Sequence, residues 1–391
     1  MIVLAKKEDC TGCFACASTC PTGCICMESD EEGFLYPSAD EADCTMCGLC
    51  AAVCPVRNQY ETHGQPEAFA CRNKDDSTRL QSSSGGIFSA LAEQVIRDGG
   101  VVFGAVFDGS SVVSHTYIDT TDQLSRLRGS KYVQSRIGES YCDAKRFLEQ
   151  GRQVLFSGTP CQIGGLLSYL GKPHDNLLCI DLICCGVPSP KLWERYLSFR
   201  KDRAGSSIHQ VSFRDKTRGW RQASVRILFT NGAEYRQTHE KDPYMRTFSS
   251  CISLRPSCYV CKFRTLSRQS DLTLGDFWGI EQVLASIDDD LGTSLVLVHS
   301  EKGVRHLYRI RQELIELRSV DVEAALQYNP RALRSVEIHP KRDAFFRDFD
   351  RLPFDRLVDR YCRMAIAARA RRRFAAGVRR ILRRLKPGGD R

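Results

Sequence analysis

Apolar residues in the middle of the chain are spaced in a way that predicts alternating strands and helices. Short runs rich in β-branched and aromatic residues predict buried strands at residues 100–107, 153–156, 177–183 and 294–299. Apolar residues recur at helical spacing at residues 87–96 and 163–170. Strands interleaved with helices favour an α/β domain with a mostly parallel or mixed sheet.

The same pattern divides the chain into four parts. We expect a small α+β domain in residues 1–60, which are rich in cysteine, glycine and proline. A polar linker at residues 61–67 leads to the α/β domain, which we expect to span residues 68–350. Beyond it, residues 361–391 form a basic tail whose apolar residues recur at the spacing of an amphipathic helix.

Composition excludes several classes of protein. Apolar residues make up 42% and charged residues 26% of the 391 residues, which is typical of globular domains rather than of disordered or collagen-like chains. No apolar run reaches the ~18 residues that a membrane helix needs. Residues 1–9 show no apolar segment followed by a cleavage site, so we expect no secretory signal and a cytoplasmic location.

The net charge of +9 comes from the tail. Residues 363–391 contain eleven Lys or Arg and one acidic residue, so the rest of the chain is close to neutral. A basic amphipathic helix binds an anionic membrane surface (here the inner face), an acidic partner or nucleic acid, or it is simply a solvated terminal helix. Nucleic acid is the least favoured of these, because no aromatic platform for base stacking accompanies the tail.

Twenty cysteines are the outlier in this composition. Without an export signal, metal ligation explains them better than disulfide bonds do. Two runs of the form CxxCxxCxxxCP stand out, namely Cys10, Cys13, Cys16 and Cys20 before Pro21, and Cys44, Cys47, Cys50 and Cys54 before Pro55. Such runs are typical of bacterial two-cluster ferredoxins, which residues 1–60 resemble.

The spacing assigns two [4Fe–4S] clusters in a crossed fashion, because the fourth cysteine of each run reaches the other cluster. The two expected ligand sets are Cys10, Cys13, Cys16 and Cys54, and Cys44, Cys47, Cys50 and Cys20. Residues 30–33 between the runs predict a hairpin turn. A pair of zinc knuckles is the alternative, although zinc sites usually combine CxxC pairs. Cys24 and Cys26 fall outside the spacing, and we expect them to be apolar fillers beside a cluster.

Three stretches of the α/β domain carry the residues of a ligand site. Residues 82–86 (SSSGG) precede a predicted helix, where backbone N–H groups bind phosphate, although an ordinary N-cap also explains them. Residues 129–135 (GSKYVQS) combine a cation, a phenol and an amide, or they form an ordinary polar loop. Residues 156–162 (FSGTPCQ) join a strand to a helix, the usual place of ligand contacts in α/β sheets.

Four further cysteines are placed to meet in the α/β domain. Cys161 and Cys184 follow predicted strands, and the ends of parallel strands converge at one edge of a sheet. A loop with Cys258 and Cys261 in a CxxC pair would complete a third cluster. The alternative is buried free thiols with a small zinc site. The remaining cysteines that we expect in the core or on the surface are Cys71, Cys142, Cys179 and Cys362.

Six stretches in a fixed order carry a resemblance to a known family. They are SSSGGIFSALA, RGSKYVQS, VLFSGTPCQI, LICCGVPSPKLW, RPSCYVCKF and SDLTLGDFWG. From about residue 68 to 349, the chain resembles the beta-subunit family of coenzyme F420 hydrogenases and dehydrogenases. The resemblance implies bound FAD, hydride exchange with a 5-deazaflavin, and an iron–sulfur cluster in this domain. Cys185 stands where the family usually has histidine, so any proton or hydride chemistry at that position would differ here.

The resemblance also implies a flavin site in the three stretches named above. The residues expected to hold FAD are Ser83, Ser84, Gly85, Gly86, Lys131, Tyr132, Gln134, Ser135, Gly158, Thr159 and Pro160. We expect unpaired N–H groups at residues 83–86 and 158–161 to bind the pyrophosphate and the ring carbonyls. Lys131 would place a positive charge near the flavin, and Lys131 and Cys185 are the candidates for a catalytic role.

Together these features predict an oxidoreductase that depends on flavin and iron–sulfur clusters. FAD would exchange hydride with a soluble redox substrate, with an F420-like deazaflavin favoured. Single electrons would pass through the [4Fe–4S] clusters to or from a protein partner. The alternatives are a ferredoxin-dependent reductase of a small organic substrate and an electron-relay subunit without catalysis. A zinc-bearing nucleic-acid module is disfavoured.

Overall fold

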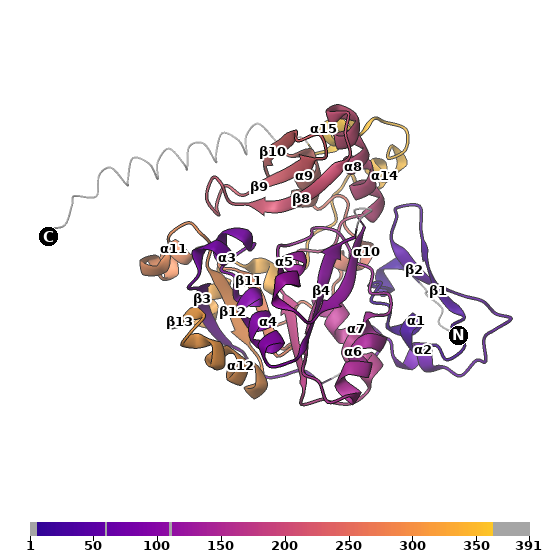
Figure 1. Cartoon of the computed structure of the whole chain (residues 1–391). Helices are drawn as coiled ribbons and strands as arrows, with labels where there is room; N and C mark the ends of the chain where they lie inside the picture. Colours follow the sequence, from indigo (N-terminus) through magenta and orange to yellow (C-terminus); the bar gives the residue numbers. More distant parts are fainter. Residues whose placement is uncertain (1–5, 59–60, 109–111, 363–391) are drawn as a thin grey trace.

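The computed structural model describes residues 6–58, 61–108 and 112–362 of the chain. A small N-terminal domain packs against a larger body that contains one large and one small sheet (Figure 1). Within this described part, no helix is both long and apolar enough to cross a membrane. The predicted amphipathic tail falls almost entirely on residues 363–391, which lie outside the described residues.

The N-terminal domain is built around an antiparallel hairpin. Its elements are η1 (Lys7–Asp9), α1 (Ala15–Thr19), β1 (Ile25–Ser29), β2 (Leu35–Ala39) and α2 (Leu49–Ala52). Asp30 closes the predicted turn, because its Oδ1 accepts from the backbone N–H groups of Glu32 and Phe34 at 3.1 and 2.9 Å. The short helices α1 and α2 carry Cys16 and Cys50, one cysteine from each run.

The large sheet has eight strands in the order β13-β3-β12-β11-β7-β6-β4-β5. The strands are β3 (Glu67–Asn73), β4 (Val101–Phe107), β5 (Val113–Ile118), β6 (Val154–Ser157), β7 (Leu177–Leu182), β11 (Leu272–Asp276), β12 (Ser294–Val298) and β13 (Ile315–Val320). The central strands β4, β6, β7 and β11 run parallel, and the outer pairs are antiparallel. The predicted α/β domain with a mixed sheet is therefore confirmed.

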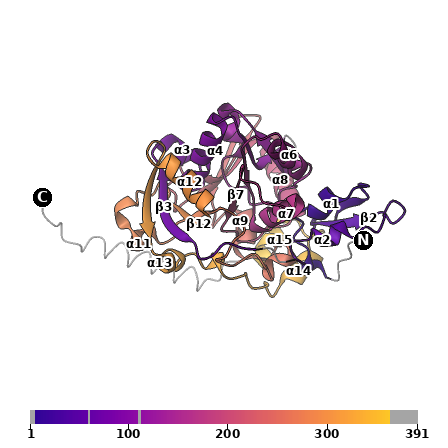
Figure 2. The same cartoon turned by 90° about the horizontal axis from the view of Figure 1, so that it is seen from below.

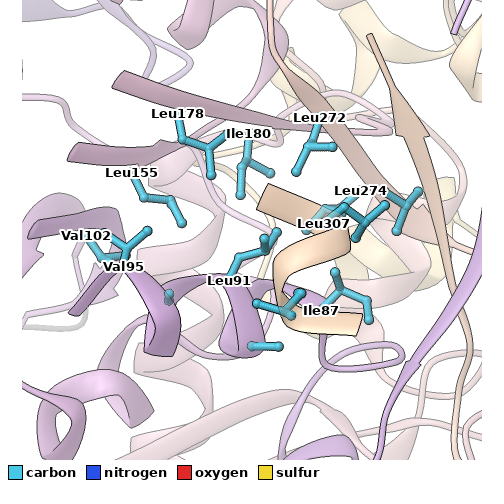
Figure 3. Packing of buried hydrophobic residues seen from close by; sticks show 14 of the residues in the cluster. Ile87, Leu91, Val95, Val102, Leu155, Leu178, Ile180, Leu272, Leu274 and Leu307 are labelled. Atoms are coloured by element: carbon cyan, nitrogen blue, oxygen red, sulfur yellow. The ribbon is translucent and has the colours of Figure 1, made fainter. Parts of the chain in front are cut away.

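Helices cover both faces of this sheet (Figure 2). They and the adjoining short helices are α3 (Asp76–Gln81), α4 (Ile87–Arg97), α5 (Leu124–Leu127), α6 (Ser140–Glu149), α7 (Pro160–Leu170), α11 (Ile280–Val283), α12 (Glu301–Arg311) and α13 (Val322–Leu326). On one face, Leu91 and Val95 of α4 and Leu307 of α12 pack on strand residues such as Leu178 and Ile180 (Figure 3).

The opposite face of the sheet holds α6 and α7, and the N-terminal domain joins the same apolar cluster. Adjacent strand residues alternate between the two faces, as Val101 and Phe103 show against Val102. Cys13 and Cys16 of the first cysteine run belong to this second cluster, so the metal-binding end of the small domain rests on the large sheet's helices.

The small sheet, which the hydrophobic pattern does not predict, has the order β10-β9-β8. Its strands and the helices around it are β8 (Ile208–Asp215), β9 (Ser224–Phe229), β10 (Glu234–Thr238), α8 (Pro190–Ala204), α9 (Pro243–Ser249), α10 (Pro256–Tyr259), α14 (Arg342–Arg347) and α15 (Phe354–Tyr361). Trp193, Phe213 and Tyr244 form its aromatic core. Polar alternation along β8 and β10 hides these strands from a search for apolar runs.

Candidate functional site

The first cysteine group lies in the loop before α1, in α1 itself and just after α2. Its members Cys10, Cys13, Cys16 and Cys54 line one cavity together. Gly12 and Phe14 have positive φ angles of 67° and 70°, which give the loop its sharp turn. The backbone N–H of Gly12 lies 3.4 Å from Cys10 Sγ. The fold thus collects the first of the two crossed ligand sets that the spacing predicts.

The second group lies between the loop before α2 and the end of α1. Cys20, Cys44, Cys47 and Cys50 line a second cavity, and Cys24 lines it with them. Cys24 Sγ is 3.4 Å from Cys20 Sγ, and the Thr22 hydroxyl is 3.6 Å from that sulfur. Cys26 is exposed. Cys24 is therefore a direct neighbour of a predicted ligand.

Burial controls the acid–base state of these thiols. It raises the pKa of Cys13 and of Cys16 to about 12, and the surrounding thiols act in the same direction. Burial also raises the pKa of Cys20, but the hydrogen bonds from Thr22 and Cys24 outweigh it and lower that pKa to about 7. A buried sulfur becomes a thiolate readily when a metal cation ligates it. The first group therefore fits a metal centre.

Both cavities fit polynuclear clusters rather than single ions. Among the described residues, no three or more His, Cys, Asp or Glu side chains converge closely enough to hold one metal ion. The thiols instead surround a cavity, as they do when each one ligates a different iron atom of a cubane. Zinc would need all four sulfurs about 2.3 Å from one point. The arrangement favours [4Fe–4S] clusters over zinc knuckles.

A third cysteine group forms where two parallel strands end. β6 and β7 are parallel neighbours, with Cys161 in the first turn of the helix after β6 and Cys184 just beyond β7. Cys258 of α10 lies within electrostatic range of Cys161, Cys184 and Cys261. The structure thus brings together the four central cysteines that the sequence predicts. Their ligation of a third cluster remains a prediction.

Backbone hydrogen bonds orient two sulfurs of this third group. The N–H of Gly186 points to Cys184 Sγ at 3.3 Å, and the N–H of Val187 to Cys258 Sγ at 3.4 Å. Hydrogen bonds to sulfur are one of the features that set the reduction potential of an iron–sulfur cluster. Burial raises the pKa of Cys161, Cys184 and Cys258 above that of a free thiol, so these groups are neutral thiols unless a metal ion ligates them.

Cys185 faces a different environment from Cys184. Burial raises its pKa to about 11, and its charged neighbours include Cys184, Arg264 and Cys251. It also acts electrostatically on Tyr132, a predicted flavin residue. Ligation by Cys184 and a role for Cys185 beside the flavin both stay predictions.

The three cysteine groups are joined by two helices. A Cβ atom at Gly165 of α7 would lie 3.0 Å from Cys13 Cβ and 3.2 Å from its Sγ, so glycine permits the close approach of the first group. One turn earlier on α7, Cys161 is in electrostatic range of Cys13. α1 carries Cys16 of the first group and ends at Cys20 of the second. The groups therefore follow one another from the large sheet to the far end of the small domain.

Two of the loops predicted to hold flavin are in direct contact. The N–H of Ser130 donates to Ser83 Oγ at 2.6 Å, which connects residues 82–86 to residues 129–135. Lys131 Nζ donates to three carbonyl oxygens at the end of α5, at 3.0 to 3.1 Å. Burial lowers the pKa of Lys131 to about 7. Its three N–H groups are used within the protein, so it would influence a ligand through its charge.

The expectation of unpaired N–H groups at the helix starts is wrong at three positions. The N–H of Gly85 donates to Ser294 Oγ, and the N–H of Gly158 to a carbonyl of β7, both at 3.0 Å. The N–H of Thr159 donates to Gln162 Oε1 at 3.0 Å. Thr159 and Gln162 form a capping box, which closes the first turn of α7 without a ligand.

Gln134 and Ser135 are engaged by other parts of the chain. Gln134 Nε2 donates to the carbonyl of Thr11 in the first cysteine group's loop at 3.0 Å. Ser135 Oγ accepts from Gln162 Nε2 at 2.9 Å. The predicted flavin residues are thus divided between the Ser83 loop and the boundary with the small domain.

Sequence reasoning missed a charged cluster against the Ser83 loop. Arg214 donates to the carbonyl of Ser83 at 3.3 Å and pairs with Asp276 at 3.1 Å. Lys216 Nζ donates to the carbonyl of Ser84 at 2.7 Å. The signal was present, because Asp276 lies in the SDLTLGDFWG stretch and the two basic residues lie in one short run, RDKTRGW.

This cluster offers donors that fit a flavin dinucleotide. Arg214 is buried and its Nε has no hydrogen-bond partner among the described residues. Burial lowers the pKa of Lys216 to about 7, as it does for Lys131, so an anionic pyrophosphate would stabilise both ammonium groups. The rings of Trp220 and Trp278 lie 4.4 Å apart and are tilted by 32°, and Trp278 is 40% exposed, which leaves an aromatic surface for a planar ring.

Comparison with known families agrees with this division of the chain. Residues 9–58 match the family described as "4Fe-4S dicluster domain". Residues 151–323 match the C-terminal part of the family described as "Coenzyme F420 hydrogenase/dehydrogenase, beta subunit". This segment, which is less than half of the chain, is similar to the F420 hydrogenase/dehydrogenase beta-subunit family. The chain therefore combines a two-cluster ferredoxin domain with a beta-subunit domain, and it is an iron–sulfur protein of the oxidoreductase and electron-transfer class.

A solved structure is also similar to this chain. It is titled "Xenon derivatization of the F420-reducing [NiFe] hydrogenase complex from Methanosarcina barkeri". The identity is 17% over 70% of this chain and 92% of that chain, with a TM-score of 0.44. Among curated proteins, none matches this chain significantly in sequence.

Proposed function

We propose that this protein is a flavin- and iron–sulfur-dependent oxidoreductase. It would exchange hydride with a soluble redox substrate, for which an F420-like deazaflavin is favoured by the family of residues 151–323. Single electrons would pass between the beta-subunit domain and a redox partner protein through three [4Fe–4S] clusters. The clusters of the ferredoxin domain provide the exit or the entry for those electrons.

The observation that carries this proposal is the succession of three cysteine groups. Cys161 on α7 lies within electrostatic range of Cys13, and α1 joins the first group to the second. An electron-transfer protein needs closely spaced centres, and the contact at Gly165 brings the ferredoxin domain against the helix that carries Cys161. A domain that only stored clusters would not need a third cysteine group at this contact.

The chain's own residues would hold the flavin and exclude water from it. Bound FAD would supply two-electron hydride chemistry and one-electron exchange with the clusters. Arg214 and the Ser83 loop would bind its anionic part, while Lys131 and Lys216 add positive charge nearby. Positive charge beside a flavin favours its anionic reduced form, which makes acceptance of hydride easier.

A relay subunit without catalysis is the second candidate. The paired N–H groups of Gly85, Gly158 and Thr159 favour it, since these positions offer no free donors to a cofactor. A ferredoxin-dependent reductase of a small organic molecule is the third candidate, and it differs from the first in its substrate.

The deciding experiment mixes anaerobically reconstituted protein with reduced F420, NADH and NADPH in separate stopped-flow runs. We expect FAD to remain bound after gel filtration, and reduced F420 to bleach the visible spectrum faster than either nicotinamide. Bound flavin that no hydride donor reduces would instead favour the reductase of an organic substrate. Protein with a full complement of iron and no flavin would contradict the enzyme proposal and favour the relay.

A further inference from the structure

Arg255 connects the first cysteine group to the third. It is fully buried, with 0% of its side chain exposed, and it directly precedes α10, which carries Cys258. Its Nε donates to the carbonyl of Cys10 at 2.8 Å. Its Nη2 lies 3.5 Å from Cys10 Sγ and donates to the carbonyl of Leu35 at 2.9 Å. The guanidinium therefore contacts both the backbone and the sulfur of a cluster ligand.

The backbone of Arg255 belongs to the frame of the third group. Its N–H donates to the carbonyl of Val187 at 2.9 Å, and its carbonyl accepts from the N–H of Cys258 at 2.9 Å. The N–H of Val187 in turn points to Cys258 Sγ. One residue thus reaches from the loops that carry Cys184 and Cys258 to the first cluster's ligand.

The guanidinium is held in place on every side. Its Nη1 donates to Gln134 Oε1 at 3.1 Å, and the ring of Tyr36 lies 4.2 Å from its centre. A Cβ atom at Gly12 would lie 2.9 Å from Nη1, so the cluster loop approaches the arginine closely because position 12 is glycine. These contacts restrict the Arg255 side chain to one conformation.

Its charge has no carboxylate partner in the described part of the chain. The partners of the guanidinium are carbonyl oxygens, one amide, aromatic rings and the Cys10 sulfur. Burying a cation without an anion is costly. The thiolates of the first [4Fe–4S] cluster are the negative charge within reach, and Cys10 provides the nearest of them.

We propose that Arg255 is a positioning residue that sets the reduction potential of the first ferredoxin cluster and fixes its approach to the third cysteine group. A buried cation that donates toward a ligand sulfur stabilises the more negative, reduced cluster and so raises its potential. The corresponding ligand of the second group, Cys44, contacts the thioether of Met46 at 3.9 Å instead. The contacts described for the second group's sulfurs, from Met46, Thr22 and Cys24, bring no positive charge, so the first cluster would hold an electron more tightly than the second does.

This inference rests on the proposed row of clusters but not on flavin or substrate. The test is a potentiometric titration of anaerobic full-length protein, with the two ferredoxin clusters resolved by electron paramagnetic resonance. Arg255→Met should lower the potential of the first cluster. We expect the equilibrium constant for sharing an electron between the two clusters to fall at least tenfold, or about 59 mV for one electron. Arg255→Lys keeps the positive charge but loses the branched guanidinium with its several N–H donors. It should lower the potential of the first cluster by a smaller amount.

A matched control separates this effect from domain docking. Arg342 is also buried and pairs with Glu32 of the hairpin turn, but within the described part of the chain its side chain contacts no cluster ligand. Arg342→Met should leave the difference between the two potentials unchanged. An equal shift in Arg342→Met would overturn the proposal, as would an unchanged first potential in Arg255→Met. Loss of the first cluster from both Arg255 variants would also overturn it, because the role would then be structural.

A second readout needs no loaded cluster. Hydrogen exchange of the metal-free chain should be faster at residues 10–14 in Arg255→Met than in Arg255→Lys, since lysine retains one donor to the Cys10 carbonyl. Unchanged exchange in both variants would contradict the positioning role. Absence of flavin or of the third cluster would refute the proposed function without changing either result, so the two failures are distinguishable.

Discussion

The ferredoxin domain and the beta-subunit domain gather their cysteines in opposite ways. The first needs only residues 10–54, in which short helices and tight turns hold two sets of thiols. The second gathers Cys161, Cys184, Cys258 and Cys261 from two strand ends and a distant loop. A local set is visible as a spacing in the sequence, whereas a long-range set depends on the order of strands in a sheet.

The two regions should also respond differently to the substitution of a cluster ligand. The cavity of the second ferredoxin group has a fifth cysteine, Cys24, at its wall. In the third group, the fixed ends of β6 and β7 and the turn at α10 each contribute to one constellation. We therefore expect the second ferredoxin group, which has Cys24 at its wall, to tolerate the loss of a ligand through local rearrangement, and the third group not to tolerate it.

The largest expected effect is therefore loss of the third cluster. Cys258→Ser should reduce the iron content from about twelve to about eight atoms per chain, because one cubane of four irons is lost. Cys161→Ser, Cys184→Ser and Cys261→Ser should behave alike. Iron analysis and electron paramagnetic resonance of anaerobic preparations measure the loss, and the ferredoxin signals should remain.

Cys185→Ser is the matched control for this experiment, since Cys185 is adjacent to a predicted ligand and is buried, but is not itself a predicted ligand. It should retain about twelve irons. If Cys185→Ser loses four irons and Cys184→Ser loses none, the ligand assignment is wrong by one residue. Eight irons in the unaltered protein would remove the third cluster altogether.

The ferredoxin domain should respond differently to the loss of a ligand. Cys20→Ser should keep most of its second cluster, because Cys24 Sγ lies only 3.4 Å from the lost sulfur and can ligate in its place. Cys20→Ser/Cys24→Ser should lose about four irons, as a single substitution does in the third group. Complete loss in the single variant would show that Cys24 is only a packing residue.

The sequence predicted local features better than assembled ones. The crossed ligand sets and the Asp30 turn follow from spacing alone, since they depend on residues within one short segment. The mixed sheet followed from short apolar strands such as β6 and β7. The β8–β10 sheet was missed because partly exposed strands carry charged residues along their length, as Arg236 on β10 shows.

In the predicted flavin loops, several hydrogen bonds differ from what the sequence led us to expect. Thr159 was predicted to leave its N–H for a ligand, yet Gln162 three residues later completes a capping box. Lys131 was expected to face the flavin, yet it donates to the end of α5. Arg214 and Asp276 come together from different sheets, 62 residues apart, and no local pattern could reveal that contact.

Docking of the two domains offers a smaller effect. Arg342 donates to Glu32 Oε1 at 2.8 Å and to the carbonyl of Leu254 at 3.1 Å. Arg342→Met should cost about 1.5–3 kcal/mol, the usual worth of hydrogen bonds to charged groups. Amide hydrogen exchange at residues 31–34 should accelerate about tenfold or more, since 1.4 kcal/mol is a factor of ten. Lys7→Met is the control, because Lys7 is 55% exposed in its pair with Asp30 and its loss should matter little. Equal acceleration in both variants would place the docking elsewhere.

The smallest effect concerns Lys131, a buried basic residue on the flavin side of the beta-subunit domain. Burial lowers the pKa of Lys131 to about 7, whereas the unfolded chain keeps the ordinary value near 10.5. Between these values the unfolded chain binds more protons, so the free energy of unfolding rises with pH. From pH 7 to pH 9, this gain should amount to about 2 kcal/mol, and Lys131→Met should lack it. Anaerobic urea titrations of flavin-free protein at the two pH values measure the difference.

Bound FAD should flatten the pH dependence of the wild-type protein's free energy of unfolding, because an anion near the ammonium group of Lys131 raises its pKa. A Lys131→Met variant with the same pH slope as the wild type would assign that slope to other groups and remove Lys131 from the buried charges that favour the flavin site.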